Sequence, residues 1–224
     1  MTQWLKNNRG FLAFLLLFGL FRTAVADWNP IPSGSMHPNV LEGDVVFVNR
    51  LAYDLKLPLT DRILAHVGNP RRGDIVTFSS PVDGTRLIKR LIALPGDQVE
   101  MRDKRLVING VAARYAPVAG APEPGVGDDA NWRVERLLEH TSAGSQHEIQ
   151  WLDGRHSVDS FATVTIPQGY YLMLGDNRDN SADSRFIGLV PRHLLIGKAV
   201  RILVSADIKG NWMPRLDRFG QALL

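Results

Sequence analysis

The chain has 224 residues, of which 45% are hydrophobic and 22% are charged, as expected of a globular protein with a sizeable core. Its 26 Lys and Arg residues barely exceed its 23 Asp and Glu residues, and no long basic run is present, so the charge pattern gives no support to nucleic-acid binding. There is no cysteine, which excludes disulfides, Cys-ligated zinc and cysteine nucleophiles. The six histidines form no ligand pair at helical spacing, so we expect no catalytic metal.

The first predicted element is an apolar segment at residues 11–21, FLAFLLLFGLF, which follows Lys6 and Arg9. Two interpretations are open from the residues alone. A cleaved secretory signal would end in an A-x-A site, and residues 24–26, AVA, match one. A retained membrane anchor is the alternative, since a helix over residues 11–26 would rise ~24 Å, which is short but workable for a bilayer. In both cases the preceding cations keep the N-terminus in the cytoplasm and the following residues lie outside it.

Beyond residue 29 the pattern favours β-strands. Runs of β-branched and other apolar residues bounded by turn residues stand at 43–51, 73–78, 86–94, 147–153, 161–167 and 197–205, and residues 97–113 read as a hairpin. Between residues 115 and 145 the pattern weakens. There, residues 116–130 are rich in Pro, Gly and Ala and are expected to be a loop, followed by a weakly amphipathic stretch at 132–140. An insertion over roughly 102–165 therefore divides a mainly β core into two parts.

The first candidate for chemistry is a short serine-containing loop, NPIPSGSMHPNV at residues 29–40. Such a segment is most often only a turn, but one of its serines could be a nucleophile. His37 stands two residues after Ser35, yet neighbours on one loop rarely form a Ser–His hydrogen bond, and no aspartate is placed to orient the ring. We therefore do not expect a Ser–His–Asp triad.

A second candidate is Lys89, because strand alternation puts it on one face between Leu87 and Leu91. An ordinary lysine, with a pKa of ~10.4, is a poor base at neutral pH, and lowering that pKa to roughly 7 disfavours the charged form by about 4 kcal/mol. Desolvation among apolar side chains can supply a shift of this size. The alternative is an ordinary snorkelling or ion-paired strand lysine.

The third candidate is the acidic segment LGDNRDNSADSRFIG at residues 174–188. An EF-hand calcium loop is excluded, because Arg178 and Ser181 stand where an oxygen ligand and a glycine are required. A solvated acidic turn is one remaining interpretation. The other is an ordered loop, in which Arg178 and Arg185 pair with the carboxylates and hold Ser181 in place.

Together these segments resemble the type I signal peptidases, the membrane-bound Ser-Lys endopeptidases that remove signal peptides from exported proteins. The resemblance covers nearly the whole chain. The apolar segment is followed, in the family's order, by PSGSM, RGDIVTF, LIKRLIALPGD and GDNRDNSADSR. The last of these motifs is the most specific.

The resemblance implies a role for several residues of these motifs. Ser35 would be the nucleophile and Lys89 the general base, with Ser181 hydrogen-bonded to the lysine amine to orient it. The Ser35 backbone N–H and the Ser33 hydroxyl would form the oxyanion hole.

The resemblance also implies a substrate cleft and partners. The positions that match the family's cleft are Ile31, Pro32, Met36, Val40, Leu87 and Ile88. Shallow apolar pockets there would select small residues at the −3 and −1 positions of a signal peptide, whose backbone would add as a strand. Asp183 and Arg185 match an ion pair that braces the last motif. Signal peptides of secreted preproteins and the lipid bilayer are the expected partners of a monomer with no cofactor, metal or nucleic acid.

The implied fold class is mainly β, a signal-peptidase-like β catalytic core with an inserted smaller β-rich cap region, preceded by one N-terminal transmembrane helix. We expect a cytoplasmic tail at 1–10, an anchor at 11–27, a catalytic core at 28–101 and 166–224, and an inserted domain at 102–165. The expected location is the bacterial cytoplasmic (inner) membrane, crossed once, with the catalytic domain on the periplasmic face.

The chain departs from the best-known enterobacterial pattern in having one apolar segment rather than two and no cysteines. Neither departure touches the catalytic set. The family favours a retained anchor, and self-cleavage after Ala24-Val25-Ala26 remains a hypothesis.

Other functions are open. One is a related Ser-Lys peptidase dedicated to a single substrate, such as a pilin-processing enzyme. A soluble self-cleaving regulator would need a DNA-binding N-terminal domain, where this chain has an apolar segment. A non-catalytic membrane-tethered β module would bind peptides without turnover.

Overall fold

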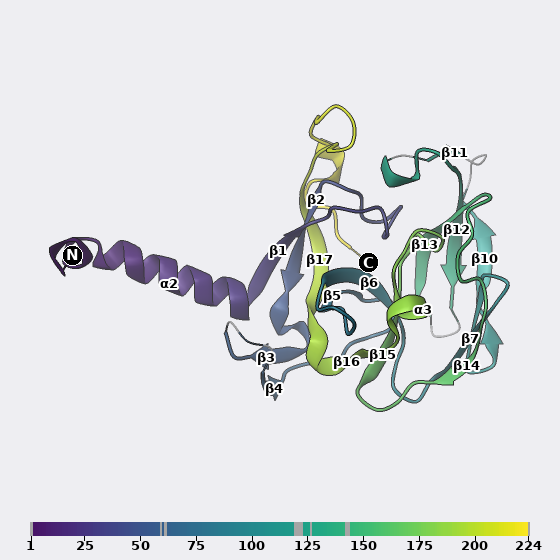
Figure 1. Ribbon diagram of the computed structural model, residues 1–224, viewed down its shortest axis with the longest axis horizontal. Coiled ribbons are helices and arrows are strands. Elements are labelled where there is room, and N and C mark those ends of the chain that lie inside the picture. Colours follow the sequence, from purple (N-terminus) through teal and green to yellow (C-terminus); the bar gives the residue numbers. More distant parts are fainter. Residues whose placement is uncertain are drawn as a thin grey trace.

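A seven-stranded antiparallel sheet forms the centre of the computed structural model (Figure 1), which describes residues 2–58, 60, 62–118, 123–125, 127–141 and 144–223. In spatial order the sheet contains β1 (Ala26–Pro30), β2 (Asp44–Asn49), β17 (Leu195–Ser205), β5 (Ile75–Ser79), β6 (Arg86–Ala93), β15 (Tyr170–Leu174) and β16 (Val190–Pro191). It therefore joins segments from both ends of the chain.

Two four-stranded sheets lie on the side of the central sheet opposite the N-terminal helix (Figure 1). The first contains β14 (Phe161–Thr165), β7 (Gln98–Arg102), β8 (Arg105–Ile108) and β9 (Val111–Ala112). The second contains β10 (Arg114–Pro117), β12 (Arg133–His140), β11 (Glu123–Pro124) and β13 (Gln146–Leu152). Apart from the helices at the N-terminus, the remaining described elements are β3 (Asp54–Lys56), β4 (Ile63–His66), the short helix α3 (Ser184–Ile187) and 3-10 turns at Arg50–Ala52, Gly127–Asp129, Arg192–Leu194 and Leu216–Arg218.

The mainly β class is confirmed, and each predicted strand segment contains a strand. The stretch between residues 115 and 145 contains more strand than expected. β10 extends into the expected loop at 116–130, β11 lies within it, and β12 covers the expected weakly amphipathic stretch at 132–140. β12 pairs with β13 in continuous register from Val134↔Leu152 to His140↔Gln146. These cross-strand partners stabilise a strand that its own sequence barely indicates. The expected boundary between residues 101 and 102 lies within β7, and the division into a core and an inserted domain stays a prediction.

The apolar N-terminal segment is helical and projects away from the sheets (Figure 1). Helix α1 (Thr2–Asn7) precedes α2 (Arg9–Ala24), and none of the residues of α2 is buried. Within the described residues, no helix combines the length and the apolar character needed to cross a bilayer. Helix α2 ends at Ala24, and Asp27, the last residue of the expected anchor at 11–27, belongs to β1, where it pairs with Val48 and accepts hydrogen bonds from Arg22 and Arg86. The bounds of the anchor stay a prediction.

The core lies in three clusters, and two of them flank the segments that carry the candidate site. Ile31, Met36 and Val40, on the loop after β1, pack with residues of β2, β5 and β17. Leu87 and Leu91 of β6 belong to a second cluster, whereas Ile88 packs against the first. This division between the two faces of β6 is the predicted alternation, and it holds β6 between two apolar layers.

Candidate active site

Ser35 lies on the loop that joins β1 to β2. Met36 and Val40 are fully buried and hold the loop from below, and the Val40 N–H donates to the Met36 carbonyl at 3.0 Å. The His37 N–H donates to the Gly34 carbonyl at 3.1 Å and closes a turn that contains Ser35. Ser35 itself is only 8% exposed. The loop is therefore ordered by packing and by its own hydrogen bonds, which fix the position of the hydroxyl.

Lys89 reaches this hydroxyl from β6, the strand next to β5. Its Nζ donates to Ser35 Oγ at 2.7 Å and to the Ile88 carbonyl at 2.9 Å. The cross-strand partner of Lys89 is Val76, and Lys89 is 2% exposed. The structure thus brings together the two residues that the sequence proposes as nucleophile and base.

Desolvation by burial lowers the pKa of Lys89 from 10.5 to about 8. The negative charges of Asp183 and Asp176 oppose this change, and the positive charge of Arg185 adds to it. Since a neutral amine has a lone pair that can accept a proton, a substantial fraction of Lys89 can act as a base near pH 8.

Asp183 and Arg185 form a buried ion pair in two parallel hydrogen bonds, both at 2.8 Å. The Asp183 carboxylate also accepts the Gly175 N–H at 2.9 Å, and Arg185 donates to the Arg178 carbonyl at 2.6 Å. These bonds tie the beginning and end of the acidic segment together. The segment is therefore the ordered loop of the two alternatives, with the Asp183–Arg185 ion pair inside it and further ion pairs to residues outside it.

The same segment approaches the loop that carries Ser35 at Gly175. A Cβ at this position would lie 2.5 Å from the Ser35 carbonyl oxygen and 2.2 Å from Ser181 Oγ, so only glycine allows this contact. The Asn177 N–H donates to the Ser35 carbonyl at 3.2 Å. The Ser181 hydroxyl is buried and makes no hydrogen bond within the described residues, so the expected bond to the Lys89 amine is not formed. The amine already donates to Ser35 and to Ile88 instead.

The other predicted residues fall into two groups. Pro32 and Ser33 are exposed beside Ser35, and Leu87 and Ile88 are half-buried on β6. Ile31, Met36 and Val40 are buried in the core cluster below the loop. An approaching peptide would therefore meet the first group directly, whereas the second group shapes the loop from beneath.

His37 has a different environment from the one a catalytic histidine needs. Its Nε2 lies 2.5 Å from Glu42 Oε2 and its Nδ1 lies 2.9 Å from Asp129 Oδ2. Both ring nitrogens therefore face carboxylates, and neither is available to accept the Ser35 proton. Sequence reasoning missed Glu42 and Asp129, because Asp129 stands in the Gly- and Pro-rich stretch far from the recognised motifs.

Buried ion pairs connect the acidic segment to its surroundings. Arg90 of β6 donates to both carboxylate oxygens of Asp176 at 2.8 Å. Arg178 donates to Glu139 of β12 at 2.7 and 2.6 Å. The Arg178 guanidinium holds the pKa of Glu139 well below its usual range, although burial alone would raise it. Both carboxylates are thus paired with a buried arginine.

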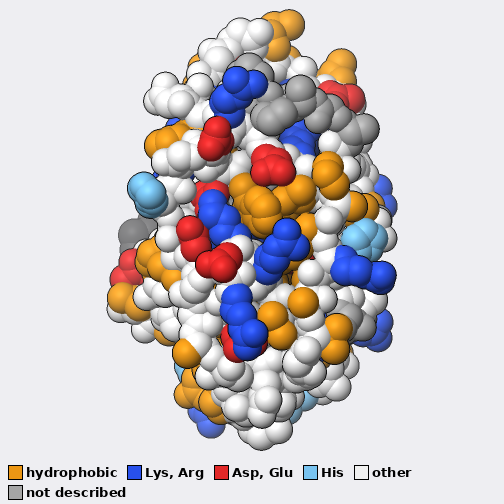
Figure 2. Space-filling view, turned by 90° about the vertical axis from the view of Figure 1, so that its right-hand side faces the viewer, with side chains coloured by type: hydrophobic (Ala, Val, Ile, Leu, Met, Phe, Trp, Pro, Cys, Tyr) orange, Lys and Arg blue, Asp and Glu red, His pale blue; other side chains and the backbone are white. Residues whose placement is uncertain are grey.

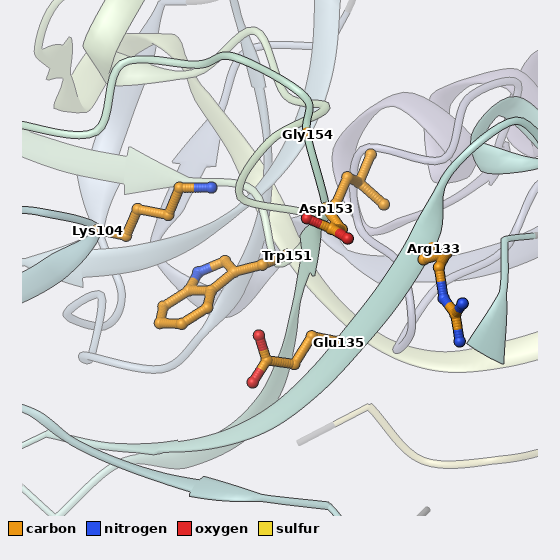
Figure 3. A pocket seen from close by; sticks show the side chains of 7 residues that line it. Lys104, Arg133, Glu135, Trp151, Asp153 and Gly154 are labelled. Atoms are coloured by element: carbon orange, nitrogen blue, oxygen red, sulfur yellow. The ribbon is translucent and has the colours of Figure 1, made fainter. Parts of the chain in front are cut away.

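A cavity of about 430 Å³ lies elsewhere, on the second four-stranded sheet and the β7–β8 turn (Figure 3). It is lined by Lys104, Arg133, Glu135, Trp151, Leu152, Asp153 and Gly154. The face of the molecule that carries the two smaller sheets shows a central group of hydrophobic side chains bordered by charges of both signs (Figure 2). None of the predicted site residues lines the cavity, so it is separate from the candidate active site. Within the described ranges, no group of three His, Asp or Glu residues is arranged to hold a metal ion.

A buried serine hydroxyl next to a desolvated amine suits a hydrolase that uses a serine nucleophile. Comparison with known proteins gives the family: the chain belongs to the signal peptidases of peptidase family S26, whose family model matches residues 1–204. The protein is accordingly a protease of the signal peptidase I class, and the removal of signal peptides is the reaction of that class. The predicted resemblance is confirmed.

The individual relatives cover most of the chain. Signal peptidase I of Pseudomonas aeruginosa is 34% identical over 228 residues, which cover 96% of this chain and 78% of that protein. Signal peptidase I of Pseudomonas fluorescens is 35% identical with the same coverage. A crystal structure of a signal peptidase I from Enterococcus faecalis V583 is 33% identical and covers 58% of this chain and 96% of that chain, but its TM-score of 0.34 is too low to support a statement about the fold.

Proposed function

We propose that this protein is a membrane-bound serine endopeptidase that cleaves preproteins after small-X-small sites such as Ala-X-Ala, with Ser35 as nucleophile and Lys89 as general base. The observation that carries the proposal is the 2.7 Å contact between Lys89 Nζ and Ser35 Oγ inside a buried site. A lysine in water would be charged at neutral pH and could not accept a proton. Burial supports the neutral form at this position.

The proton path follows from the contacts of the amine. A neutral amine has two N–H donors and one lone pair. In that form one N–H would keep the bond to the Ile88 carbonyl, and the 2.7 Å contact with Ser35 would reverse its direction, with the lone pair accepting the Ser35 O–H. When Ser35 attacks the scissile carbonyl, Lys89 takes this proton and later delivers it to the leaving amine. In the second half-reaction, Lys89 activates the water that hydrolyses the acyl-enzyme in the same way.

Charge stabilisation and amine orientation complete the proposed site. The Ser35 N–H and the exposed Ser33 hydroxyl would donate to the oxyanion, where the loss of one donor typically costs ~10²–10³ in rate. The protonated amine has a third N–H that needs an acceptor. The Ser181 hydroxyl is buried next to Gly175 and makes no hydrogen bond within the described residues, so we assign it the orienting role in the charged intermediate.

The substrate is proposed to bind beside Ser35 as an extended strand. β1 ends the central sheet and leads into Ile31 and Pro32, so its edge offers backbone groups to a peptide. Pro32, Leu87 and Ile88 line the approach, and the buried Ile31, Met36 and Val40 limit its depth. A shallow apolar floor of this kind favours alanine over larger residues.

Membrane attachment is part of the proposal. Seven large apolar side chains of α2 are 43–65% exposed, and these are Phe11, Phe14, Leu15, Leu16, Leu17, Phe18 and Phe21. Lipid is the solvent that suits them. We therefore propose that the N-terminal segment holds the protein in the bacterial inner membrane as a single-pass monomer. The central sheet and the two four-stranded sheets would then lie on the periplasmic face. Flotation of the full chain with liposomes, compared with a chain that starts at Asp27, tests this attachment.

The experiment that tests the catalytic assignment follows hydrolysis of a signal-peptide substrate with an Ala-X-Ala site by the detergent-purified protein. We expect cleavage after the second alanine, and its loss in Ser35→Ala and in Lys89→Ala. The matched controls are Ser205→Ala and Lys198→Met, which remove a serine and a lysine from β17 and should leave cleavage intact.

Each alternative function has its own result. Cleavage that survives Lys89→Ala would remove the lysine from the mechanism. Peptide binding without turnover by the folded wild type would indicate the non-catalytic module, and turnover of only one preprotein would indicate a dedicated peptidase.

A further inference from the structure

The nucleophile loop contains a buried charge cluster that the proposed reaction does not use. His37, Glu42 and Asp129 are 2%, 3% and 0% exposed. The imidazole ring lies between the two carboxylates, at 2.5 Å from Glu42 and 2.9 Å from Asp129. A buried cluster of this kind is costly to assemble, so each member needs a physical reason for its place.

The geometry defines the charge of the ring. An ionised carboxylate only accepts hydrogen bonds, so two carboxylates that face the two ring nitrogens require a hydrogen on each nitrogen. Glu42 and Asp129 are the charged groups that face His37, and burial alone would favour a neutral ring. The hydrogen bonds and charges of the two carboxylates outweigh burial and raise the pKa of His37 from 6.5 to about 9.

Asp129 connects the imidazolium to three other segments. Its carboxylate accepts hydrogen bonds from the side-chain amides of Gln150 on β13 at 2.7 Å, Asn177 at 2.7 Å and Asn180 at 2.8 Å. These partners are neutral, so His37 supplies the only positive charge in direct contact with this carboxylate among the described residues. Asp129 lies in the Gly127–Asp129 turn, which joins β11 to β12 in the second four-stranded sheet. The loop between these two strands therefore contacts the loop that carries Ser35.

Asn177 carries this connection to the backbone around Ser35. Its side-chain amide donates to the Gly34 carbonyl at 3.0 Å as well as to Asp129, and its backbone N–H donates to the Ser35 carbonyl at 3.2 Å. The peptide groups before and after Ser35 are therefore both held by one residue, whose amide is in turn oriented by Asp129.

We propose that the His37 imidazolium is a positioning residue for the reaction: by holding Asp129 beside the nucleophile loop, it fixes the Asn177 amide and thereby the backbone that orients Ser35. This inference rests on the proposed function, because its effect is on the rate of attack by Ser35. His37 does not touch the reacting atoms. Its protonated state should therefore change kcat and leave KM nearly unchanged.

The experiment measures kcat and KM for the Ala-X-Ala peptide from pH 7 to pH 10.5 in wild type, His37→Gln and a matched control, His66→Gln. His66 also contacts an aspartate, Asp54 at 2.6 Å, but it lies on β4 with a 65% exposed side chain. Below pH 8 we expect His37→Gln to lower kcat by about 10-fold, because small displacements of a nucleophile cost this much, and to change KM by less than about 2-fold. His66→Gln should match wild type.

The ratio of wild-type to His37→Gln kcat separates positioning from a general structural effect. Titration of other groups, Lys89 included, changes kcat in both proteins alike, and its effect cancels in the ratio. The ratio should fall toward 1 as the pH rises through about 9, because the wild type then loses its imidazolium as well. A ratio that stays constant with pH, or a change confined to KM, would overturn the proposal.

Two further measurements keep the proposal testable if His37→Gln does not fold. Asp129→Asn should lower kcat with the same pH course, and a pH-independent loss would count against the proposal. An NMR titration of the His37 Cε1–H in the Ser35→Ala protein should show a midpoint near 9, and a midpoint near 6.5 would exclude the imidazolium. A wild type that cleaves no peptide would refute the proposed function, whereas cleavage with a flat ratio would refute only the role of His37.

Discussion

Two buried basic side chains near Ser35, those of Lys89 and His37, have pKa values that shift in opposite directions. Lys89 and His37 are each 2% exposed, yet the pKa of Lys89 falls to about 8 and that of His37 rises to about 9. His37 touches two carboxylates, whereas Lys89 forms no ion pair within the described residues. Direct contact with a carboxylate, rather than burial, therefore decides which group keeps its proton.

Arginines account for the difference at Lys89. The two carboxylates whose charges reach the amine, Asp183 and Asp176, are bound by Arg185 and Arg90 in short bidentate contacts. Both oxygens of each carboxylate thus bind an arginine, and within the described residues neither carboxylate forms an ion pair with the lysine. The acidic segment, which looks from its composition like a site for cations, leaves its nearest lysine without a direct partner.

The largest expected effect comes from placing a permanent charge at the lysine position. Lys89→Arg keeps a long basic side chain but cannot become neutral at the pH of the assay, since guanidinium stays protonated up to about pH 12. We expect kcat/KM for the Ala-X-Ala peptide to fall by at least ~10³, because the proton acceptor is lost. The measurement is steady-state cleavage at pH 8, with Lys198→Arg as the control.

Activity in Lys89→Arg within about 10-fold of wild type would be incompatible with a neutral lysine base. Lys198→Arg should retain full activity, because Lys198 lies on β17 and pairs with Asp74 at 2.6 Å. A loss in both variants would point to a general effect of arginine on the fold instead.

A smaller effect concerns stability, because the buried amine opposes folding at neutral pH. The folded pKa of Lys89 lies below its unfolded value, so the unfolded chain binds more protons between pH 8 and 10.5 and stability rises with pH there. Lys89→Met should therefore raise the free energy of unfolding by up to about 3 kcal/mol at pH 7, and by less than about 1 kcal/mol at pH 10.

Urea unfolding of inactive Lys89→Met and of wild type at the two pH values measures this gain. A Lys89→Met protein that is no more stable than wild type at pH 7 would show that the amine is solvated or paired in solution.

The smallest of the three effects has the opposite sign. The folded pKa of His37 lies above its unfolded value, so the stability it contributes is fully present below pH 6.5 and is lost as the pH rises through about 9. Relative to His37→Gln, wild type should lose about 2 kcal/mol of unfolding free energy between pH 7 and pH 9. Parallel pH dependences in the two proteins, followed by urea unfolding, would show that His37 carries no extra proton in the native state.

The residues near Ser35 show which features of the site can be predicted from the sequence. The positions of Ser35 and Lys89 and the burial of the lysine were accessible, because motif order and strand alternation between Leu87 and Leu91 are local patterns. The pairing of Asp183 with Arg185 was accessible for the same reason.

The partners of His37 could not be predicted, because they depend on contacts between distant segments. Asp129 meets His37 across 92 residues, from a stretch without hydrophobic periodicity, and nothing in that stretch distinguishes it from a loop aspartate. The strand β12 was missed because its stability comes from pairing with β13. Likewise, the ion pair between Arg90 and Asp176 depends on how β6 lies beside the acidic segment, which the composition of these segments does not predict.

The pH dependence of kcat/KM for the Ala-X-Ala peptide tests most directly the claim that buried Lys89 is the base for Ser35, because it reports the ionisation of the free enzyme. The account predicts activity that rises with pH to a half-maximum near pH 8, as Lys89 loses its proton. A rise centred near 6.5, the value of an ordinary histidine, or activity that persists in Lys89→Ala, would contradict it.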